Sequence, residues 1–217
     1  MKKNILVVII VIFTLNINAQ NVKFGAKAGL NISSIYGSEA ATNNEFRYSF
    51  HVGVVSEIKI SDKFTFQPEI LFSSQGTRMN YEDFIEDQID VVYEYISVKS
   101  VSAMNYLNIP LMIKYYPFNN FSIEFGPQVG FLLSVNNEFE LKSGRDTISQ
   151  SSSNMDGTNR VDFALNLGLG YKLENGIFFN SRYNFGLSAI NKEMENQIYF
   201  EKARNGVLQL SIGYFFN

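Results

Sequence analysis

Hydrophobic and polar residues alternate along most of this chain, and the alternation is clearest between Val161 and Leu187. Apolar side chains take every second position from Val161 to Leu173, with small, polar or charged residues between them. The segment Glu174-Asn175-Gly176 follows, and Asn-Gly suits the positive φ values of a tight hairpin turn. The alternation then resumes from Ile177. A period of two predicts strands, because a helix would space apolar residues three and four apart.

Six further segments alternate in the same way, which makes eight predicted strands. They span residues 24–35, 46–58, 64–73, 107–115, 121–131 and 208–216. The connections between the eight are alternately long and short, as in transmembrane barrels with tight periplasmic turns and longer outer loops. Pro68 falls on the apolar face of the third segment and predicts an edge or a bulge there. The sequence therefore predicts an all-β, eight-stranded antiparallel up-and-down transmembrane barrel.

The long connections are polar. The one from Gly76 to Ala103 is acidic, but its part from Val91 to Val98 is rich enough in β-formers to extend the flanking hairpin beyond the main sheet. The one from Asn136 to Asn159 is rich in Ser and Asn, and we expect it to be a loop.

The composition of the two faces indicates which one points outward. The non-apolar face combines many glycines with a nearly balanced set of charges: Lys27, Arg47, Lys114, Lys172 and Arg182 against Glu57, Glu69, Glu124 and Asp162. Eight strands enclose an interior that side chains just fill, so these charges could pair there while the apolar face meets lipid. A soluble, lipocalin-like barrel also has eight strands, but its outer face would carry more charge and fewer glycines.

The N-terminus has the features of an export signal. Lys2 and Lys3 precede an apolar run from Ile5 to Leu15, and Asn18-Ala19 is a cleavage site of the usual kind. We therefore expect residues 1–19 to be a signal peptide and residues 20–217 to be the outer-membrane barrel domain. Without residues 1–19, 16 basic residues face 21 acidic ones, which disfavours nucleic-acid binding. The chain has no cysteine, which excludes disulfides and thiolate metal sites.

Four short motifs resemble a known family. They are Lys27-Ala28-Gly29-Leu30-Asn31, Gln67-Pro68-Glu69-Ile70-Leu71, Tyr106-Leu107-Asn108-Ile109-Pro110-Leu111 and Phe125-Gly126-Pro127. Together they are similar to the small outer-membrane barrels of the PorT-like, "porin family" type common in Bacteroidetes. The resemblance implies an OmpA-type eight-stranded barrel in the bacterial outer membrane, and for most members no known biochemical activity.

The inward charges form the sharpest candidate site. Ionisable groups at membrane depth must face a polar interior and find partners. We expect an interior charge network of Glu69, Arg182, Lys114, Glu124, Glu57 and Lys27, in which Glu69 contacts Arg182 or Lys114. The functional interpretation is a gated pore, and the structural one is a salt-bridged plug. We favour the plug because eight strands leave little lumen.

An acidic run and the single histidine are two further candidate sites. Glu82, Asp83, Glu86 and Asp87 lie in an acidic run of the second long connection and are candidates for a loop interaction, although such runs commonly just solvate a segment. His51, the single histidine, would be the base of a lipid-modifying enzyme, but no signature places a nucleophile beside it. We expect a packed, hydrogen-bonded histidine, no catalytic residue, no metal and no cofactor.

These observations predict a non-enzymatic outer-membrane barrel whose outer loops contact lipopolysaccharide, other outer-membrane lipid or other envelope proteins. Three alternatives stay open: a narrow channel or carrier for a small or apolar solute, an accessory component of outer-membrane secretion, and a lipid-modifying enzyme.

Overall fold

The computed structural model describes residues 22–37, 45–86, 93–144, 146–192 and 202–216. The predicted signal peptide and Asp87 lie outside these residues. The strands are β1 (Val22–Tyr36), β2 (Arg47–Lys59), β3 (Phe64–Glu86), β4 (Tyr93–Tyr115), β5 (Phe121–Ser143), β6 (Asp146–Ser152), β7 (Val161–Lys172), β8 (Ile177–Gly186) and β9 (Arg204–Phe216). No helix among the described residues is long and apolar enough to span a bilayer.

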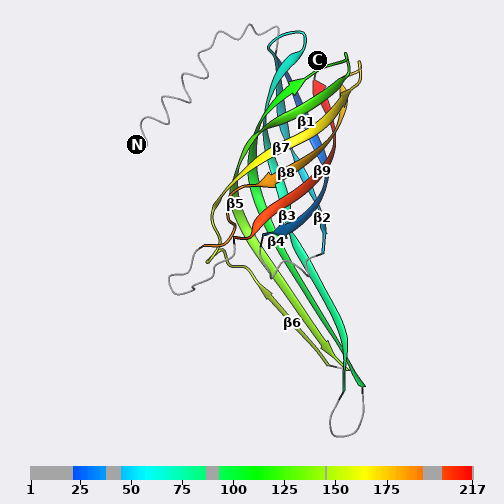
Figure 1. The fold of residues 1–217 in the computed structure, drawn as a ribbon, viewed down its shortest axis with the longest axis vertical. Coiled ribbons are helices and arrows are strands. Elements are labelled where there is room, and N and C mark those ends of the chain that lie inside the picture. Colours follow the sequence, from blue (N-terminus) through cyan, green and yellow to red (C-terminus); the bar gives the residue numbers. More distant parts are fainter. Residues whose placement is uncertain (1–21, 38–44, 87–92, 145, 193–201, 217) are drawn as a thin grey trace, which may run out of the picture.

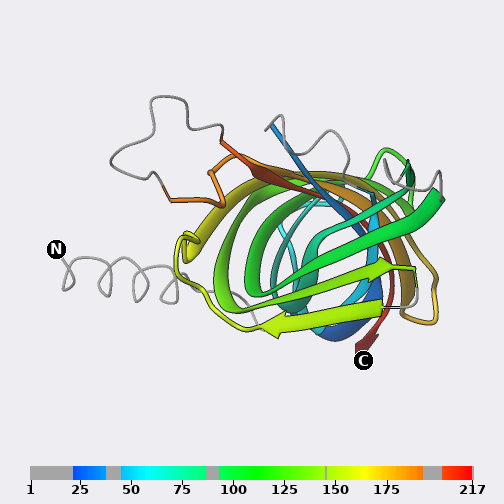
Figure 2. The same cartoon turned by 90° about the horizontal axis from the view of Figure 1, so that it is seen from below.

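Eight of these strands form a closed antiparallel ring. Each pairs with its neighbour in the order β1, β2, β3, β4, β5, β7, β8, β9, and β9 pairs back to β1 from Phe24↔Phe216 to Tyr36↔Arg204. The view along the barrel shows the strands curving round this ring (Figure 2). Closure matters because every backbone group in the hydrocarbon layer must be hydrogen-bonded. The predicted eight-stranded antiparallel barrel is confirmed.

The hairpin from Val161 to Leu187 has the predicted orientation. From Val161 to Tyr171 and from Phe178 to Gly186, exposed and buried residues alternate strictly; the apolar series is exposed and Arg182 is among the buried residues. Gly176 has a φ of 91°, the left-handed conformation for which the turn needs glycine. This turn lies at the same end of the barrel as the other two short turns and the end of β9 (Figure 1).

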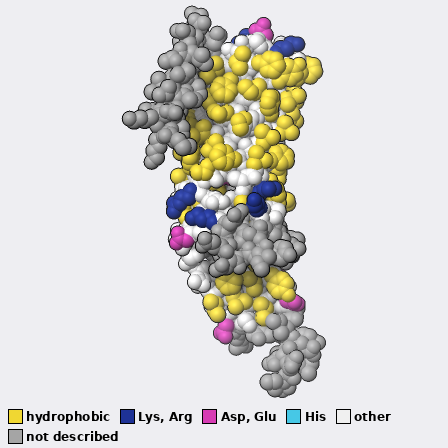
Figure 3. All heavy atoms as spheres, turned by 60° about the vertical axis from the view of Figure 1, so that its left-hand side comes forward, with side chains coloured by type: hydrophobic (Ala, Val, Ile, Leu, Met, Phe, Trp, Pro, Cys, Tyr) yellow, Lys and Arg dark blue, Asp and Glu magenta, His cyan; other side chains and the backbone are white. Residues whose placement is uncertain are grey.

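The apolar wall is continuous around the barrel. Exposed Leu, Ile, Val and Phe side chains cover the side seen in Figure 3, and Lys and Arg side chains lie where that surface ends. Exposed aromatic residues stand near both ends, among them Phe24, Tyr48, Phe64, Tyr171 and Tyr214. Such aromatic belts flank the lipid-facing band of outer-membrane barrels.

Two predicted loops are strands instead. β5 runs on to Ser143 and β6 follows it, within the segment from Asn136 to Asn159 that we expected to be a loop. β3 and β4 likewise continue to Glu86 and from Tyr93, so Val91 to Val98 does extend the hairpin in its described part. These extensions leave the barrel at the end opposite the short turns (Figure 1). The polar composition concealed them because both faces of this part meet water.

Ladders of the ring are interrupted beside prolines, most clearly between β3 and β4. Pro68 lies opposite Leu111, and the β3–β4 register resumes only at Leu71↔Asn108. Pro110 lies in the same gap, on β4. Neither proline has an N–H to donate, which explains why the ladder breaks here. The predicted irregularity at Pro68 is therefore present, within the barrel rather than at an open edge.

Candidate functional site

A layer of five charged side chains fills the half of the barrel nearer the short turns. Arg182 of β8 donates to Glu69 of β3 at 2.9 and 3.1 Å and to Glu124 of β5 at 2.9 Å. Lys27 Nζ lies 2.8 Å from Glu69, and Lys114 Nζ lies 3.0 Å from Glu124. All five side chains are buried. The contact of Glu69 with Arg182 agrees with the hypothesis, whereas Lys114 pairs with Glu124.

This layer joins five strands through their side chains. Three cations share two carboxylates, so each carboxylate bridges Arg182 and one lysine. Desolvating such charges is costly, and removing one partner from a buried pair is more costly still. The arrangement is suited to holding the barrel wall together rather than to releasing a proton or an ion.

Glu57 does not belong to this charged layer, contrary to the prediction. Its carboxylate bonds Lys172 at 2.5 Å and accepts a hydrogen bond from the Tyr116 hydroxyl at 3.4 Å. This second group lies nearer the short turns, where Val55, Phe178 and Phe215 form an apolar cluster. Sequence parity placed Glu57 on the inward face correctly, but parity gives no depth along the barrel.

Farther from the short turns than the charged layer, His51 lies in a chain of hydrogen-bonded polar side chains that the sequence did not predict. Its Nδ1 is 2.8 Å from Asn31 Oδ1, and its Nε2 is 2.8 Å from Ser211 Oγ. Asn31 Nδ2 donates to Ser73 and to the Ser74 carbonyl, so its oxygen faces the ring and Nδ1 carries the proton. Ser211 lies on β9, His51 on β2 and Asn31 on β1. No sequence motif revealed this chain, because the three residues are far apart in the sequence.

The Ser211–His51–Asn31 chain has the connectivity of a hydrolytic triad. A serine hydroxyl donates to an imidazole that an amide holds in one tautomer. However, Asn31 and His51 are fully buried and Ser211 is 8% exposed. A triad also needs room for an acyl group beside the hydroxyl. The environment is that of a packed polar core, as predicted for His51.

An apolar cluster closes the other end of the interior. Met104 and Tyr106 of β4 pack with Leu132 and Val135 of β5 and with Ile190, which follows β8. The polar layers therefore lie between this cluster and the one formed by Val55, Phe178 and Phe215. Between the two clusters the described interior is filled mainly by buried polar and charged side chains, with Leu71 and Met112 among them.

Beyond the barrel, the strand extensions form a four-stranded sheet, β3–β4–β5–β6, which we call the protruding sheet. It comprises residues 77–86, 93–103, 134–143 and 146–152. One extra residue, Leu133, sits in β5 where the register shifts, because Asn105 pairs with Ser134 and Tyr106 with Leu132. Such a bulge changes which face the following residues occupy.

The faces of the protruding sheet are reversed relative to the barrel. Tyr81, Val98, Leu141 and Ile148 pair in one row across the four strands. This row continues the inward face of the strands, and that face is polar within the barrel. The opposite face carries Lys99, Glu140 and Ser149 in the neighbouring row, and it continues the lipid-facing wall. Outside the membrane the apolar face is therefore the inner one.

The acidic run lies on this sheet and is not a loop, which corrects the prediction. Glu82 and Asp83 are exposed and, as neighbours in β3, point to opposite faces. Glu86 ends the strand, and its side chain is not among those described. The Tyr81 hydroxyl donates to Asp83 at 2.6 Å, which raises the pKa of Tyr81. Among the described residues no group of three metal-ligating side chains converges.

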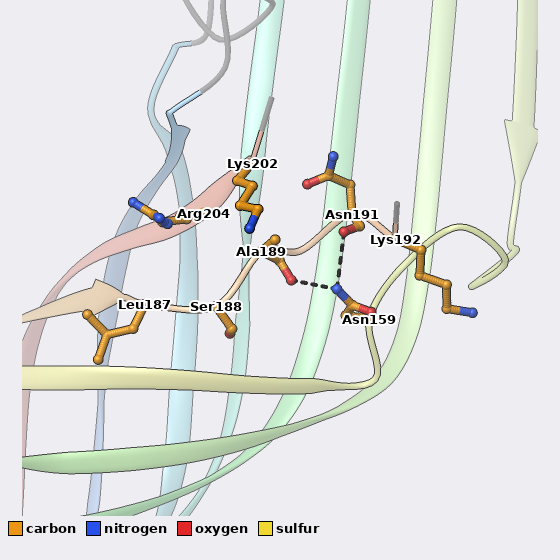
Figure 4. A pocket seen from close by; sticks show the side chains of 8 residues that line it. All are labelled: Asn159, Leu187, Ser188, Ala189, Asn191, Lys192, Lys202 and Arg204. Carbon is orange, nitrogen blue, oxygen red and sulfur yellow. Dashed lines mark hydrogen bonds between the residues drawn. The ribbon is translucent and has the colours of Figure 1, made fainter. Parts of the chain in front are cut away.

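A basic pocket lies at the outer rim of the barrel, beside the connection that follows β8. Its volume is about 470 Å³, and it is lined by Asn159, Leu187, Ser188, Ala189, Asn191, Lys192, Lys202 and Arg204 (Figure 4). Asn159 donates to the carbonyls of Ala189 and Asn191 and fixes the wall between them. Exposed Leu187 joins this pocket to the apolar surface of the barrel.

Comparison with solved structures finds small outer-membrane barrels. Ail, the attachment invasion locus protein of Yersinia pestis, is 12% identical, with 90% of this chain and 99% of that chain covered and a TM-score of 0.42. Neisserial surface protein A is 13% identical over 89% and 97%, with a TM-score of 0.40. OprG from Pseudomonas aeruginosa is 14% identical over 91% and 97%, with a TM-score of 0.34. None of the curated proteins compared matches.

The family comparison gives the assignment. Residues 18–192 match the family described as "Outer membrane protein beta-barrel domain", which covers most of the chain. The closed ring, the apolar wall and the buried polar interior agree with it. The chain belongs to this family of outer-membrane β-barrel proteins, and its place is the bacterial outer membrane.

Proposed function

We propose that this protein is a non-enzymatic barrel that anchors the protruding sheet in the outer membrane and presents it for interactions at the cell surface. The observation that carries the proposal is the sheet itself. Four strands extend past the barrel, and Tyr81, Phe139 and Ile148 on their inner face are 50, 40 and 61% exposed. A contiguous apolar patch that is exposed to water commonly marks an interaction site.

The interior supports the anchor over the channel. An ion would have to pass the cluster of Val55, Phe178 and Phe215, then the paired charges, then the cluster around Tyr106. We expect no conductance above background in planar bilayers for the purified protein. Steady conductance that Glu69→Gln or Arg182→Gln alters would favour the narrow channel instead.

Surface interaction is tested by site-specific photo-crosslinking in intact cells. With the photoreactive residue at Ser149 on β6, we expect discrete adducts to other envelope components. The matched control is Asp62, which is exposed in a short turn at the opposite end of the barrel. Equal adduct patterns at both sites, or no adduct at Ser149, would contradict the proposal.

A lipid-modifying enzyme is the second candidate, because Ser211, His51 and Asn31 have the order of a hydrolytic triad. A fluorophosphonate probe attacks an activated serine, so labelling would report on Ser211. We expect no labelling of the folded protein and unchanged lipid profiles for His51→Ala. Labelling that Ser211→Ala and His51→Ala both abolish would establish the enzyme.

Contact with the outer leaflet is a further part of the proposal. Lys192, Lys202 and Arg204 line the rim pocket together with Leu187, an exposed residue of the apolar wall, so we expect them at the depth of lipid headgroups. Cations there are suited to the phosphates of lipopolysaccharide. We expect Lys192→Gln with Arg204→Gln to reduce co-purification of lipopolysaccharide, whereas Lys63→Gln in a short turn should not. An unchanged lipid content would remove this contact.

A further inference from the structure

The outer edge of β6 is a free hydrogen-bonding edge. Among the described strands, β6 pairs with β5 alone, from Asn137↔Ser152 to Ser143↔Asp146. All seven of its residues are exposed. Its sequence, Asp-Thr-Ile-Ser-Gln-Ser-Ser, contains no proline and no lysine, two residues that commonly protect an edge strand, and its ladder has no bulge. The backbone groups on this edge can therefore pair with another extended chain.

The apolar row of the protruding sheet ends at this edge. Tyr81, Val98, Leu141 and Ile148 form a continuous strip across four strands, and Ile148 is its exposed end. A fifth strand beside β6 would place one of its side chains at the next position of the strip. Apolar cross-strand neighbours stabilise a sheet, so the favoured residue there is apolar.

The charge of the protruding sheet selects among such strands. The residues of this sheet contain seven acidic and three basic side chains, an excess of four negative charges. On the outer face, Glu138 and Glu140 lie on β5, one strand from the free edge. Glu140 is paired with Lys142 at 3.1 Å, whereas Glu138 is exposed. Basic side chains on the outer face of an added strand would complement these carboxylates.

We propose that β6 binds an extended polypeptide segment of a partner protein, whose apolar residues face the inner strip and whose basic residues face outward. The segment adds to the edge as a fifth strand, with backbone hydrogen bonds for affinity and alternate side chains for selectivity. This inference rests on the proposed function, since it names the partner of the same sheet.

A second copy of this chain does not fit the edge. Antiparallel pairing of β6 with β6 would require one barrel to be inverted in the membrane. A copy in the same membrane would have to pair in parallel after a rotation about the membrane normal. That rotation turns its sheet over, so its polar outer face, with Glu140 and Ser149, would lie beside the apolar strip. A second copy therefore does not extend the strip, and the occupant that we propose is a different chain.

The test measures the binding of synthetic peptides to the full protein in nanodiscs of zwitterionic lipid, with empty nanodiscs subtracted. The probe is a seven-residue peptide that alternates valine and lysine, matched to the length of β6. A peptide of the same composition in the order Val-Val-Lys-Lys-Lys-Val-Val cannot place valines on one face. We expect the alternating peptide to bind at least tenfold more tightly than the reordered one and than a valine–glutamate peptide.

Variants of β6 distinguish edge pairing from general attraction. We expect Ile148→Ser to weaken the binding of the alternating peptide about fivefold, whereas Thr147→Ser on the other face leaves it unchanged. Consecutive residues direct their N–H groups to opposite edges. Of Ser149→Pro and Gln150→Pro, one should therefore abolish binding while hydrogen exchange still protects the β5–β6 ladder.

Any of three peptide results would overturn the inference. They are no binding of the alternating peptide, equal binding of the reordered peptide, and binding that Ile148→Ser and both proline variants leave intact. Sedimentation that shows a dimer lost with the blocking proline would overturn it in favour of self-association. Adducts at Ser149 together with any of these results would leave the proposed function standing, so the two failures are distinguishable.

Discussion

The barrel wall and the protruding sheet share β3, β4 and β5, yet they bury opposite kinds of side chain. On β4, Lys114 and Asn108 point inward within the barrel, whereas Val98 points inward above it. The strand keeps its parity, but its polarity changes between Ala103 and Leu107. The surroundings explain the difference. Lipid solvates apolar residues on the outside of the barrel, while water meets both faces of the protruding sheet.

β5 makes the same change by a different route. Its apolar residues keep odd numbers from Phe121 to Leu141, but the extra residue at Leu133 turns Phe139 and Leu141 to the inner face. One strand changes its sequence and its neighbour inserts a bulge. Both place apolar residues on the inner face above the membrane, which indicates that the inner strip is a specified feature of this sheet.

The largest expected effect is in the barrel. Glu69→Gln removes the carboxylate that pairs with Arg182 and Lys27 and leaves two buried cations facing a neutral amide. Breaking such a buried pair costs about 3–5 kcal/mol. The free energy of unfolding in urea, measured in lipid vesicles, checks the size. Glu82→Gln, on the protruding sheet, is the matched control and should change it little; equal losses would contradict the comparison.

The second largest effect comes from placing an arginine on the apolar surface of each region, the lipid-facing wall of the barrel or the inner face of the protruding sheet. Leu167→Arg places a charge on the lipid-facing wall, where the cost is about 2–4 kcal/mol at the bilayer midplane. Ile148→Arg places the same charge on the exposed strip, where water still solvates it. Heat-modifiable gel mobility should show a folding defect for Leu167→Arg alone. A comparable defect for Ile148→Arg would mean that β6 lies in lipid.

Deleting Leu133 and Ser134 together should affect the protruding sheet more than the barrel. With two residues fewer, regular alternation after Leu132 would turn Phe139 and Leu141 outward, and the row through Val98 and Ile148 would lose its third member. Because the sheet opens locally without the barrel, we expect cleavage of β6 by added protease to rise by at least roughly tenfold. Unchanged cleavage would show that the bulge does not set the face of β5.

The smallest expected effect is a pKa on the protruding sheet. The hydrogen bond and negative charge of Asp83 raise the pKa of the Tyr81 hydroxyl. Asp83→Asn should bring this pKa down toward that of an ordinary exposed tyrosine, followed by NMR of the labelled ring. Glu82→Gln, which points to the other face, should not move it. A lowered pKa in both variants would mean that general charge, not the contact, is responsible.

Sequence reasoning reached the barrel because alternation is local. The period of two, the turn at Gly176 and the inward side of Arg182 all follow from residues within one hairpin. It also placed Glu69 and Glu124 inside, since charges at membrane depth have nowhere else to go.

The alternation could not predict how deep a side chain lies along the barrel axis or which side chains meet across the interior. Parity could not separate Glu57 from the charged layer or bring Ser211 to His51, because these contacts depend on register around the whole ring. Apart from the predicted extension at Val91 to Val98, the protruding sheet was missed for another reason, since its polar residues resemble a loop. The change of apolar residues from even to odd positions along β4 was the signal that could have revealed it.

The central claim is that the apolar face reverses where the chain leaves the membrane. Because the chain has no cysteine, single cysteines can be labelled on intact cells with a membrane-impermeant maleimide. The account predicts rapid labelling of Val98→Cys and Ile148→Cys and none of Ile109→Cys and Leu167→Cys. Protection of Val98 and Ile148, or labelling of Ile109 and Leu167, would contradict it.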